Sequence, residues 1–258
     1  MHKFGFLKVK NMEIRTFGGG RRMAECNRLL SDAPLGNRVG RLILLPIPTA
    51  RDNKYITGTA TGVGEIVKML DADTCVAGYN IPREILNGAI GMGAFVYDAA
   101  LDEDFLVSNA ELTARGALGY ILTHSKSDLS DMSVGVVGYG RIGIRLVRWL
   151  LPFGARITVY TNRPEVAVEL GEIGISASLV GEKIDFSKLD LLINTAPARQ
   201  LDDSLIPPEL MIIDLASGSI FEPSAKVIKL ASIPDALYPI TAGRLYAQGI
   251  IRAIGGGG

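Results

Sequence analysis

The sequence is poor in cysteine and histidine and has no long apolar run. Its 258 residues include two cysteines and two histidines. Cys26 and Cys75 form no Cys-x-x-Cys pair and have no histidine nearby, which argues against a metal site. We expect two buried or half-buried thiols in a reducing cytoplasm. The apolar stretches, such as residues 42–45, are far shorter than the ~20 residues that span a bilayer.

No charge of one sign is in excess. Lysine and arginine together number 27, aspartate and glutamate also number 27, and the pI is about 6.7. The chain therefore has no basic surplus with which to neutralise a phosphate backbone or to bind an anionic membrane surface. We expect neither nucleic acid nor a membrane as a partner. The first eleven residues contain no apolar segment of the kind that a secretory signal requires, and we predict a cytoplasmic protein.

Short apolar strands alternate with helical stretches along the chain. The expected strands are residues 13–17, 41–47, 74–78, 133–137, 156–160, 189–194, 211–215 and 229–233. The expected helices are residues 21–30, 81–86, 110–122, 141–151, 164–170 and 241–254. Residues 94–98 fit a strand or a helix equally well. This alternation predicts an α/β fold with a mainly parallel sheet.

A glycine motif links one strand to the helix that follows it. Gly138, Gly140 and Gly143 form Gly-x-Gly-x-x-Gly between the strand at 133–137 and the helix at 141–151. In such a turn the first glycine permits a tight bend, the second lets the backbone approach a pyrophosphate, and the third lets the helix pack on the strand. The backbone N–H groups of the first helical turn, at Arg141 and Ile142, and the positive end of the helix dipole favour phosphate there. The motif predicts a dinucleotide site; the alternative is a domain that keeps the turn for folding alone.

The next strand indicates which cofactor binds. A site for NAD usually places Asp or Glu at this strand end, about 20 residues after the glycines, to bind the ribose 2′-hydroxyl. This chain has Thr161, Asn162 and Arg163 there instead. An arginine pairs well with a 2′-phosphate, so we predict NADP(H) in preference to NAD(H). The alternative is that Arg163 is a solvated turn residue.

Three later loops carry polar residues. We assign those of the first two loops to the crevice that would hold the nucleotide, and that of the third to the start of the last helix. Asn194 and Thr195 follow one strand and Asp214 ends the next, and the carboxyl ends of strands face the ligand in a doubly wound sheet. An ordinary turn or a loop cap is the alternative at each. Thr241 opens the last helix as an expected N-cap, with a substrate contact as the alternative.

These patterns together predict three parts of the chain. Residues 1–124 form a smaller N-terminal α/β domain that ends in an interdomain helix at about 110–122, and the family resemblance described next implies that this is the substrate-side domain. Residues 125–240 form a doubly wound, parallel-sheet Rossmann domain. Residues 241–258 form a C-terminal helix and a glycine tail, which we expect to pack back on the N-terminal domain.

Several short segments resemble one family. These are Gly-Gly-Gly-Arg-Arg at 18–22, Leu-Pro-Ile-Pro-Thr-Ala-Arg-Asp at 45–52, the helix at 109–122, the glycine motif, and the loops at 192–198, 212–218 and 232–250. The residues of these segments, and the order of the segments along the chain, resemble those of the A-type subunit of dipicolinate synthase from spore-forming bacteria. This chain would be a short and divergent member of that family. The resemblance implies the oxidation of a dihydrodipicolinate-type cyclic dicarboxylate to dipicolinate with a nicotinamide cofactor. It also implies the flavoprotein-like B-type subunit of dipicolinate synthase as partner and the mother cell as the location. Whether the chain forms a homo-oligomer is left open.

Residues for a dicarboxylate substrate must supply cations and hydroxyls. The candidates are Arg22, Thr49, Arg51 and Arg244, each with a surface ion pair or a plain turn as the alternative. Glu111 and Thr241 are the candidate catalytic residues. Glu111 would accept a proton, or it would simply complement the dipole of its helix.

Two other functions compete. A D-2-hydroxy acid dehydrogenase would share the Rossmann half, but it needs a histidine near the C-terminal end as general acid and base. This chain has Ile240 at that position. The other alternative is a non-catalytic protein that binds the nucleotide and works only with its partner.

Overall fold

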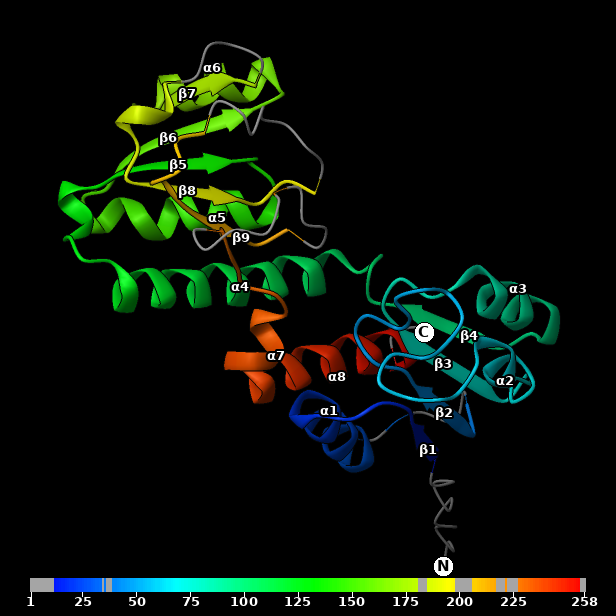
Figure 1. The fold of residues 1–258 in the computed structure, drawn as a ribbon. Helices are drawn as coiled ribbons and strands as arrows, with labels where there is room; N and C mark the ends of the chain where they lie inside the picture. Colours follow the sequence, from blue (N-terminus) through cyan, green and yellow to red (C-terminus); the bar gives the residue numbers. More distant parts are fainter. Residues whose placement is uncertain are drawn as a thin grey trace, which may run out of the picture. The chain divides into compact units, whose positions relative to one another are not determined.

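The computed structural model describes residues 12–33, 35, 39–180, 185–197, 206–216, 221 and 227–255. Contacts within the chain divide it into two compact units (Figure 1). The first contains Met1–Ser108 and Tyr238–Gly258, and the second contains Asn109–Leu237. The boundary therefore falls inside helix α4 (Glu103–His124) rather than after residue 124, and the last helix is counted with the N-terminal segment.

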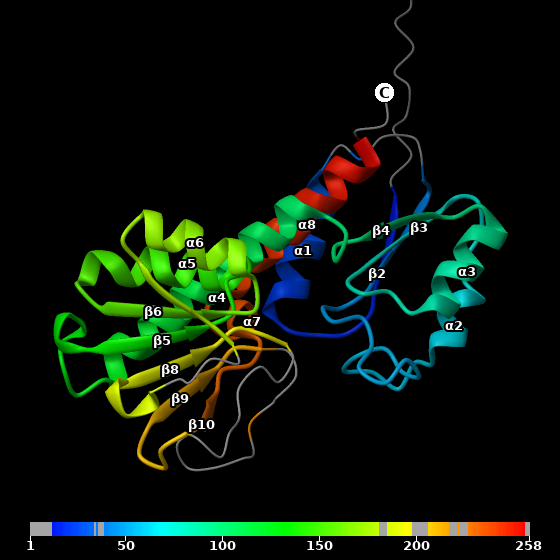
Figure 2. The same ribbon diagram turned by 90° about the horizontal axis from the view of Figure 1, so that it is seen from above.

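The first unit is a four-stranded parallel sheet with helices on its two faces. Strands β1 (Glu13–Thr16), β2 (Arg41–Leu44), β3 (Thr74–Gly78) and β4 (Phe95–Asp98) lie in that order, and all neighbours are parallel (Figure 2). Helices α1 (Arg21–Asp32) and α8 (Pro239–Gly255) pack on each other, and α2 (Val63–Val67) packs on α3 (Arg83–Met92). The segment 94–98, for which the sequence left strand and helix open, thus forms a parallel strand over Phe95–Asp98.

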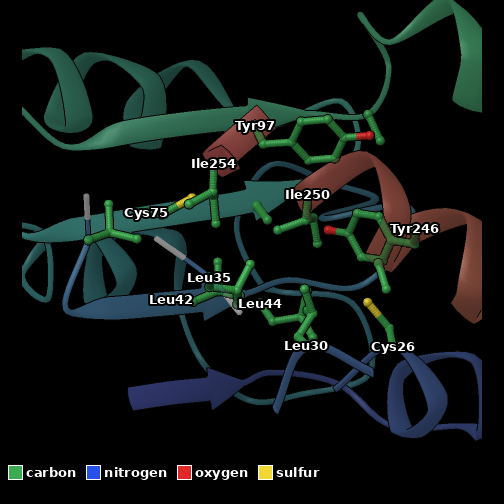
Figure 3. Close-up of a cluster of buried hydrophobic side chains, with 14 of the residues drawn as sticks. Cys26, Leu30, Leu35, Leu42, Leu44, Cys75, Tyr97, Tyr246, Ile250 and Ile254 are labelled. Atoms are coloured by element: carbon green, nitrogen blue, oxygen red, sulfur yellow. The ribbon is translucent and has the colours of Figure 1, made fainter. Parts of the chain in front are cut away.

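Two apolar clusters cover the two faces of this sheet, because successive side chains of a strand point to opposite sides. Leu42 and Leu44 join Cys26 of α1 and Tyr246 of α8 in one cluster (Figure 3). The intervening residue Ile43 joins the cluster formed by α2 and α3. Both buried cysteines therefore belong to an apolar core, as expected from their isolation in the sequence.

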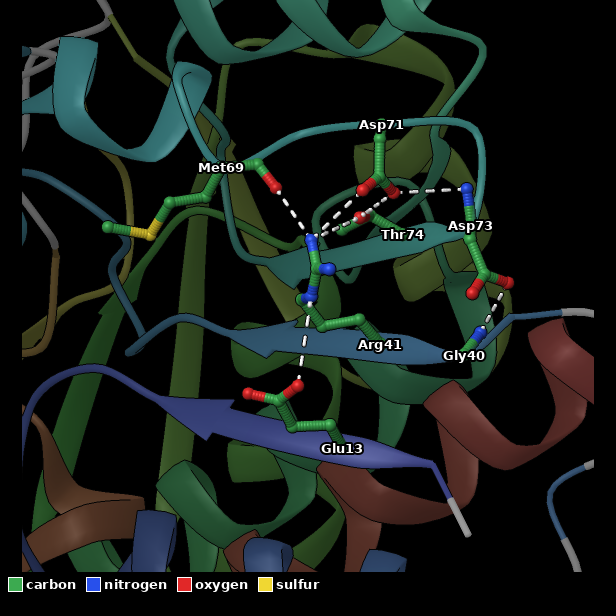
Figure 4. A network of polar contacts seen from close by, with 7 residues as sticks. All are labelled: Glu13, Gly40, Arg41, Met69, Asp71, Asp73 and Thr74. Atoms are coloured by element: carbon green, nitrogen blue, oxygen red, sulfur yellow. Dashed lines mark hydrogen bonds and ion pairs between the residues drawn. The ribbon is translucent and has the colours of Figure 1, made fainter. Parts of the chain in front are cut away.

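Arg41 holds the amino ends of the strands in the first unit (Figure 4). Its Nη1 donates to the backbone oxygen of Met69 at 3.2 Å and to Oδ2 of Asp71 at 3.1 Å. Nearby, Oδ1 of Asp73 accepts a hydrogen bond of 2.7 Å from the backbone N–H of Gly40. These polar contacts lie at the opposite end of the sheet from the carboxyl ends, so they stabilise the fold without taking part in a carboxyl-end site.

The second unit is a doubly wound, six-stranded parallel sheet. Its strands are β5 (Ser133–Val137), β6 (Arg156–Thr161), β7 (Ser176–Leu179), β8 (Leu191–Asn194), β9 (Met211–Asp214) and β10 (Val227–Lys229). Their order is β10-β9-β8-β5-β6-β7, and each pair of neighbours is parallel. The order reverses between β5 and β8, which is the topological switch point of a Rossmann fold. The predicted fold class is confirmed.

The helices and short turns of this unit are α4 in part, α5 (Arg141–Leu150), α6 (Pro164–Glu172), α7 (Ile233–Leu237) and three 3₁₀ turns, η1 (Leu129–Asp131), η2 (Leu151–Phe153) and η3 (Phe186–Lys188). Within the described ranges, no helix is both long and apolar enough to cross a membrane.

Several predicted boundaries were wrong. The strand expected at 229–233 ends at Lys229, and Ser232, with φ of +53°, turns the chain into α7. The last helix begins at Pro239, so Thr241 lies inside its first turn and is not the N-cap. The helix expected at 81–86 runs over α3, with Pro82 as its N-cap residue. Helix α2 and strand β7 were not predicted, because five residues are too few for a helical period and because β7 is polar and only partly buried.

Candidate nucleotide-binding site

Two of the three motif glycines are required by the fold itself. Gly138 has φ of +88°, and an ideal Cβ there would lie 2.9 Å from Oγ1 of Thr195. A Cβ on Gly143 would collide with the carbonyl oxygen of Gly138. These two positions exclude other residues because of a left-handed backbone and a close helix–strand approach.

Gly140 is different, because the fold alone does not explain it. No heavy atom lies within 4 Å of an ideal Cβ at this position, and the backbone, with φ of −93°, suits any residue. Gly140 is the N-cap of α5, no side chain caps that helix, and its first turn has no acidic residue. The backbone N–H groups of a helix N-terminus, together with an open backbone position there, suit a pyrophosphate. The residues present therefore fit a dinucleotide.

The end of β6 meets the same turn. Thr161 is 1% exposed, and its Oγ1 accepts a hydrogen bond from the backbone N–H of Arg163 at 3.2 Å. Arg163 is exposed, and its Nη2 donates to the backbone oxygen of Tyr139 at 2.6 Å. Asn162 beside it is exposed. The strand end thus presents a guanidinium, rather than a carboxylate, beside the glycine turn.

The ends of β8 and β9 are joined by a buried pair. Asn194 and Asp214 are both fully buried, and Nδ2 of Asn194 donates to Oδ1 of Asp214 at 2.8 Å. Each side chain also accepts from the backbone N–H two residues on, at Ala196 and Ala216 respectively, with both bonds at 3.1 Å. Such Asx turns fix a loop. Neither residue has an atom at the surface. Their role in the site would therefore be to position these loops.

Thr195 supports the glycine turn. Its Oγ1 lies 2.9 Å from the backbone oxygen of Val137 and 3.2 Å from that of Gly138. The hydroxyl is therefore used inside the protein. Its backbone N–H also donates to Val137, at 2.9 Å.

Glu111 joins two helices. Its Oε1 accepts from Nε of Arg115 and from Nε1 of Trp149, both at 2.8 Å, and its Oε2 lies 3.5 Å from Nε of Arg145. Arg115 in turn stacks over the Trp149 ring, 5.0 Å from its centroid. These contacts tie α4 to α5 and are those of a structural residue. That Glu111 accepts a proton stays a prediction.

The candidate substrate residues all lie in the first unit. Arg22 is 4% exposed, at the start of α1. Thr49 is fully buried, and its Oγ1 accepts from the backbone N–H of Tyr79 at 2.9 Å, so its hydroxyl fixes a loop. Arg51 and Arg244 are exposed. Thr241, also in this unit, is exposed on the first turn of α8.

Sequence reasoning missed Tyr139, Arg145 and Trp149. Tyr139 contributes through its backbone oxygen, for which a side-chain motif gives no signal. Its place between the first two motif glycines is the one available clue. Arg145 and Trp149 lie four residues apart on α5 and so share a helix face, but only the tertiary structure brings Glu111 to that face.

The second unit matches a family of dehydrogenase domains. Residues 111–222 match the family described as D-isomer specific 2-hydroxyacid dehydrogenase, NAD binding domain. This match supports a nicotinamide cofactor at the turn described above, and it does not distinguish NADP from NAD.

Two curated proteins are similar over part of the chain. The A-type subunit of dipicolinate synthase from Bacillus subtilis (strain 168) is 26% identical over 157 residues, which are 57% of this chain and 53% of that protein. Glyoxylate reductase of Thermococcus onnurineus (strain NA1) is 26% identical over 132 residues, 49% of this chain and 40% of that protein. The chain thus spans about half the length of the curated relatives that it matches.

A solved structure matches nearly the whole chain. The crystal structure of the A-type subunit of dipicolinate synthase from Bacillus halodurans has a TM-score of 0.77 and 19% identity, and the match covers 95% of this chain and 99% of that one. At this identity the match shows the fold. Together with the curated relative and the motifs of the sequence, it confirms the resemblance predicted above: this chain is similar to the A-type subunit of dipicolinate synthase in both sequence and fold.

Proposed function

We propose that this chain is a nicotinamide-dependent oxidoreductase that oxidises a reduced, cyclic dicarboxylate of the dihydrodipicolinate type. The observation that carries the proposal is Gly140, an open backbone position at the uncapped N-terminus of α5. A fold that needed its glycines for folding alone would need Gly138 and Gly143 but not Gly140. The dehydrogenase-type domain match supports the same conclusion.

The cofactor that we propose is NADP(H) rather than NAD(H). Arg163 supports this choice, since its guanidinium lies beside the glycine turn at the strand end where NAD-binding proteins place an acid. A carboxylate there would repel a 2′-phosphate, and an arginine attracts one. The bond to Tyr139 holds the guanidinium against the turn.

The similarity to the A-type subunit of dipicolinate synthase and the arginines of the first unit support this substrate class. Arg51 and Arg244 are exposed and suit carboxylates, which an arginine binds with two parallel hydrogen bonds. When bound, an oxidised nicotinamide supplies the acceptor for a hydride from the substrate ring. The ring would also lose a proton, to Glu111 or to bound water, and would gain the double bond that completes its aromaticity.

The name of the relative, which describes one subunit of a synthase, supports a second subunit. We propose that a flavoprotein-like partner, the B-type subunit of such a synthase, completes the activity in the cytoplasm of the mother cell of a sporulating bacterium. Addition of this partner to the isolated chain should raise turnover. Equal turnover with and without it would remove the partner from the proposal.

The first experiment is titration calorimetry of the full chain with NADP⁺ and NAD⁺. We expect binding of both, with NADP⁺ the tighter. Absence of heat with either dinucleotide at millimolar concentration would refute the proposed function. A Gly140→Ala variant provides the matched control, because it should fold normally and should bind neither cofactor well.

A second candidate is a D-2-hydroxy acid dehydrogenase, favoured by the matched domain family and by the glyoxylate reductase relative. The general acid and base that such an enzyme needs is a histidine. The chain has two histidines. One is His2, and the other is His124, which is exposed at the end of α4 and bonded to the backbone oxygen of Tyr120. This candidate would be favoured if the purified chain oxidised D-2-hydroxy acids and did not oxidise the cyclic dicarboxylate.

A further inference from the structure

Asp214 is a buried acid with one unused oxygen. Its Oδ1 accepts from Nδ2 of Asn194 at 2.8 Å and from the backbone N–H of Ala216 at 3.1 Å. In the described part of the chain, nothing donates a hydrogen bond to its Oδ2. Burial of a polar oxygen without a partner is unfavourable, and such groups in folded proteins call for an explanation.

No cation balances this carboxylate within the described ranges. The register pairs Lys229 of β10 with Asp214. Lys229 is nevertheless exposed, and no ion pair joins these two described residues. Asn194, the nearest side-chain partner, is a neutral amide. The carboxylate is therefore held in place by neutral donors.

The place of Asp214 in the sheet relates it to the nicotinamide half of a dinucleotide. In a doubly wound sheet each half binds one mononucleotide across the switch point. The glycine turn and the end of β6 belong to the half formed by β5, β6 and β7, which faces the adenosine ribose. The carboxyl ends of β8 and β9, with Asn194 and Asp214, belong to the other half.

The two redox forms of the cofactor differ in charge at that half. The oxidised nicotinamide ring carries one positive charge, and the reduced ring is neutral. We propose that the buried carboxylate of Asp214 favours the oxidised cofactor over the reduced one by attracting the charged ring. This inference rests on the proposed function, and it specifies which form of the cofactor the chain is built to take up.

Asp214 would act through space and not by contact. It is fully buried, and the interaction of two charges is much stronger inside a protein than in water, because the effective dielectric constant is lower. Asp214 is thus an electrostatic, positioning residue and not a catalytic one. Asn194 and Ala216 hold the carboxylate at the sheet edge.

The test compares the affinities for NADP⁺ and NADPH in the full chain, by titration calorimetry, before and after Asp214→Asn. The variant is nearly isosteric and keeps an oxygen for the donors at Asn194 and Ala216. We expect the Kd of NADP⁺ to rise roughly tenfold, the size of one charge–charge interaction in a protein, and the Kd of NADPH to change less than about twofold. The ratio of the two constants is the readout, since a merely structural role would raise both together.

Asn194→Ser is the matched control. It removes the amide that donates to Asp214 but keeps the carboxylate and a hydroxyl able to accept from Ala196. Both affinities should fall by a similar factor, and their ratio should stay as in the parent chain. A loss of the NADP⁺ preference in this variant would overturn the proposal.

The remaining outcomes are also decisive. Equal changes for the two forms in Asp214→Asn, or no change, would show that Asp214 serves the fold alone. If the variant shows no cooperative thermal transition, the affinities of the parent chain provide the test. We expect the parent chain to bind NADP⁺ at least as tightly as NADPH. A clear preference for NADPH would overturn the inference. Absence of binding of either form to the parent chain refutes the proposed function itself.

Discussion

The guanidinium of Arg163 donates a hydrogen bond to the backbone oxygen of Tyr139 at 2.6 Å. The bond links the end of β6 to the turn between Gly138 and Gly140. It places a positive charge at the edge of the turn, where a carboxylate would be expected in a protein that binds NAD. We therefore expect the preference between the two cofactors to depend on this one side chain.

Replacement of Arg163 by alanine should weaken NADP⁺ binding selectively. We expect the Kd of NADP⁺ to rise about tenfold or more, because a charge-assisted pair with a phosphate is lost, with little effect on NAD⁺. Titration calorimetry with the two oxidised cofactors measures both constants. Arg148→Ala, on an exposed part of α5, is the control and should change neither. An equal loss for both cofactors in Arg163→Ala would show that the bond to Tyr139 shapes the turn and has no part in cofactor choice.

The three motif glycines should respond differently to alanine. Gly143→Ala should lower the free energy of unfolding by about 1–3 kcal/mol, because its Cβ collides with the backbone oxygen of Gly138. Gly140→Ala should leave stability within about 1 kcal/mol yet weaken dinucleotide binding strongly, since the new methyl group would occupy the open backbone position proposed for the pyrophosphate. Urea unfolding and calorimetry on the two variants separate these effects. Normal cofactor binding by Gly140→Ala would contradict the assignment of the turn.

Substitution of Glu111 should lower stability, and it also tests the predicted proton transfer. Glu111→Ala removes the acceptor of the Trp149 indole and the partner of two arginines, and we expect a loss of about 1 kcal/mol, since the carboxylate is partly exposed. Glu111→Gln keeps an acceptor for the indole and should lose less. Trp149 is the single tryptophan, so its fluorescence reports the contact directly. A Glu111→Gln chain that folds normally but has lost its turnover would instead show that this residue accepts the proton.

The two buried thiols predict a loss of stability at alkaline pH. Burial raises the pKa of Cys75 to about 12, and burial also raises the pKa of Cys26. In the unfolded chain a thiol loses its proton near pH 8.5. Above that pH the unfolded state therefore binds fewer protons than the folded state, so the free energy of unfolding falls as pH rises. Urea unfolding between pH 7 and pH 10 measures the slope, and Cys75→Val should reduce it.

The same burial predicts slow reaction of both thiols with a disulfide reagent. In the folded chain at neutral pH, each thiol should react only as fast as the core around it opens to solvent. In urea, both thiols should react at once. Rapid reaction of either cysteine without denaturant would contradict their place in the core of the first unit.

Much of the second unit is predictable from its sequence. The strand before Gly138, the helix after Gly140 and the strand that ends at Asn194 were predicted close to their observed bounds. Buried parallel strands are short apolar runs, and the turns between them need glycine, so local sequence carries the information. The first unit was less predictable because α2 is only five residues long and is stabilised by packing against α3.

The interpretation of single polar residues depended much more on the structure. By their sequence context, Thr49, Asn194 and Thr195 are able to contact a ligand. In the structure their side chains hydrogen-bond instead to neighbouring strand ends and to the loop after β3. A hydroxyl or amide has the same sequence signal in either role. Only its burial and its partners distinguish the two.

By itself, the sequence determined the parallel α/β fold, the position of the glycine turn and the absence of an acid at the end of β6, because each of these depends on residues close together in the chain. The tertiary structure alone decided that Glu111 joins two helices, that Arg163 reaches Tyr139 and that Asp214 is buried against Asn194. These contacts join residues 20 to 38 positions apart, and a residue's partners at such separations follow from how the strands and helices pack and not from its neighbours in sequence.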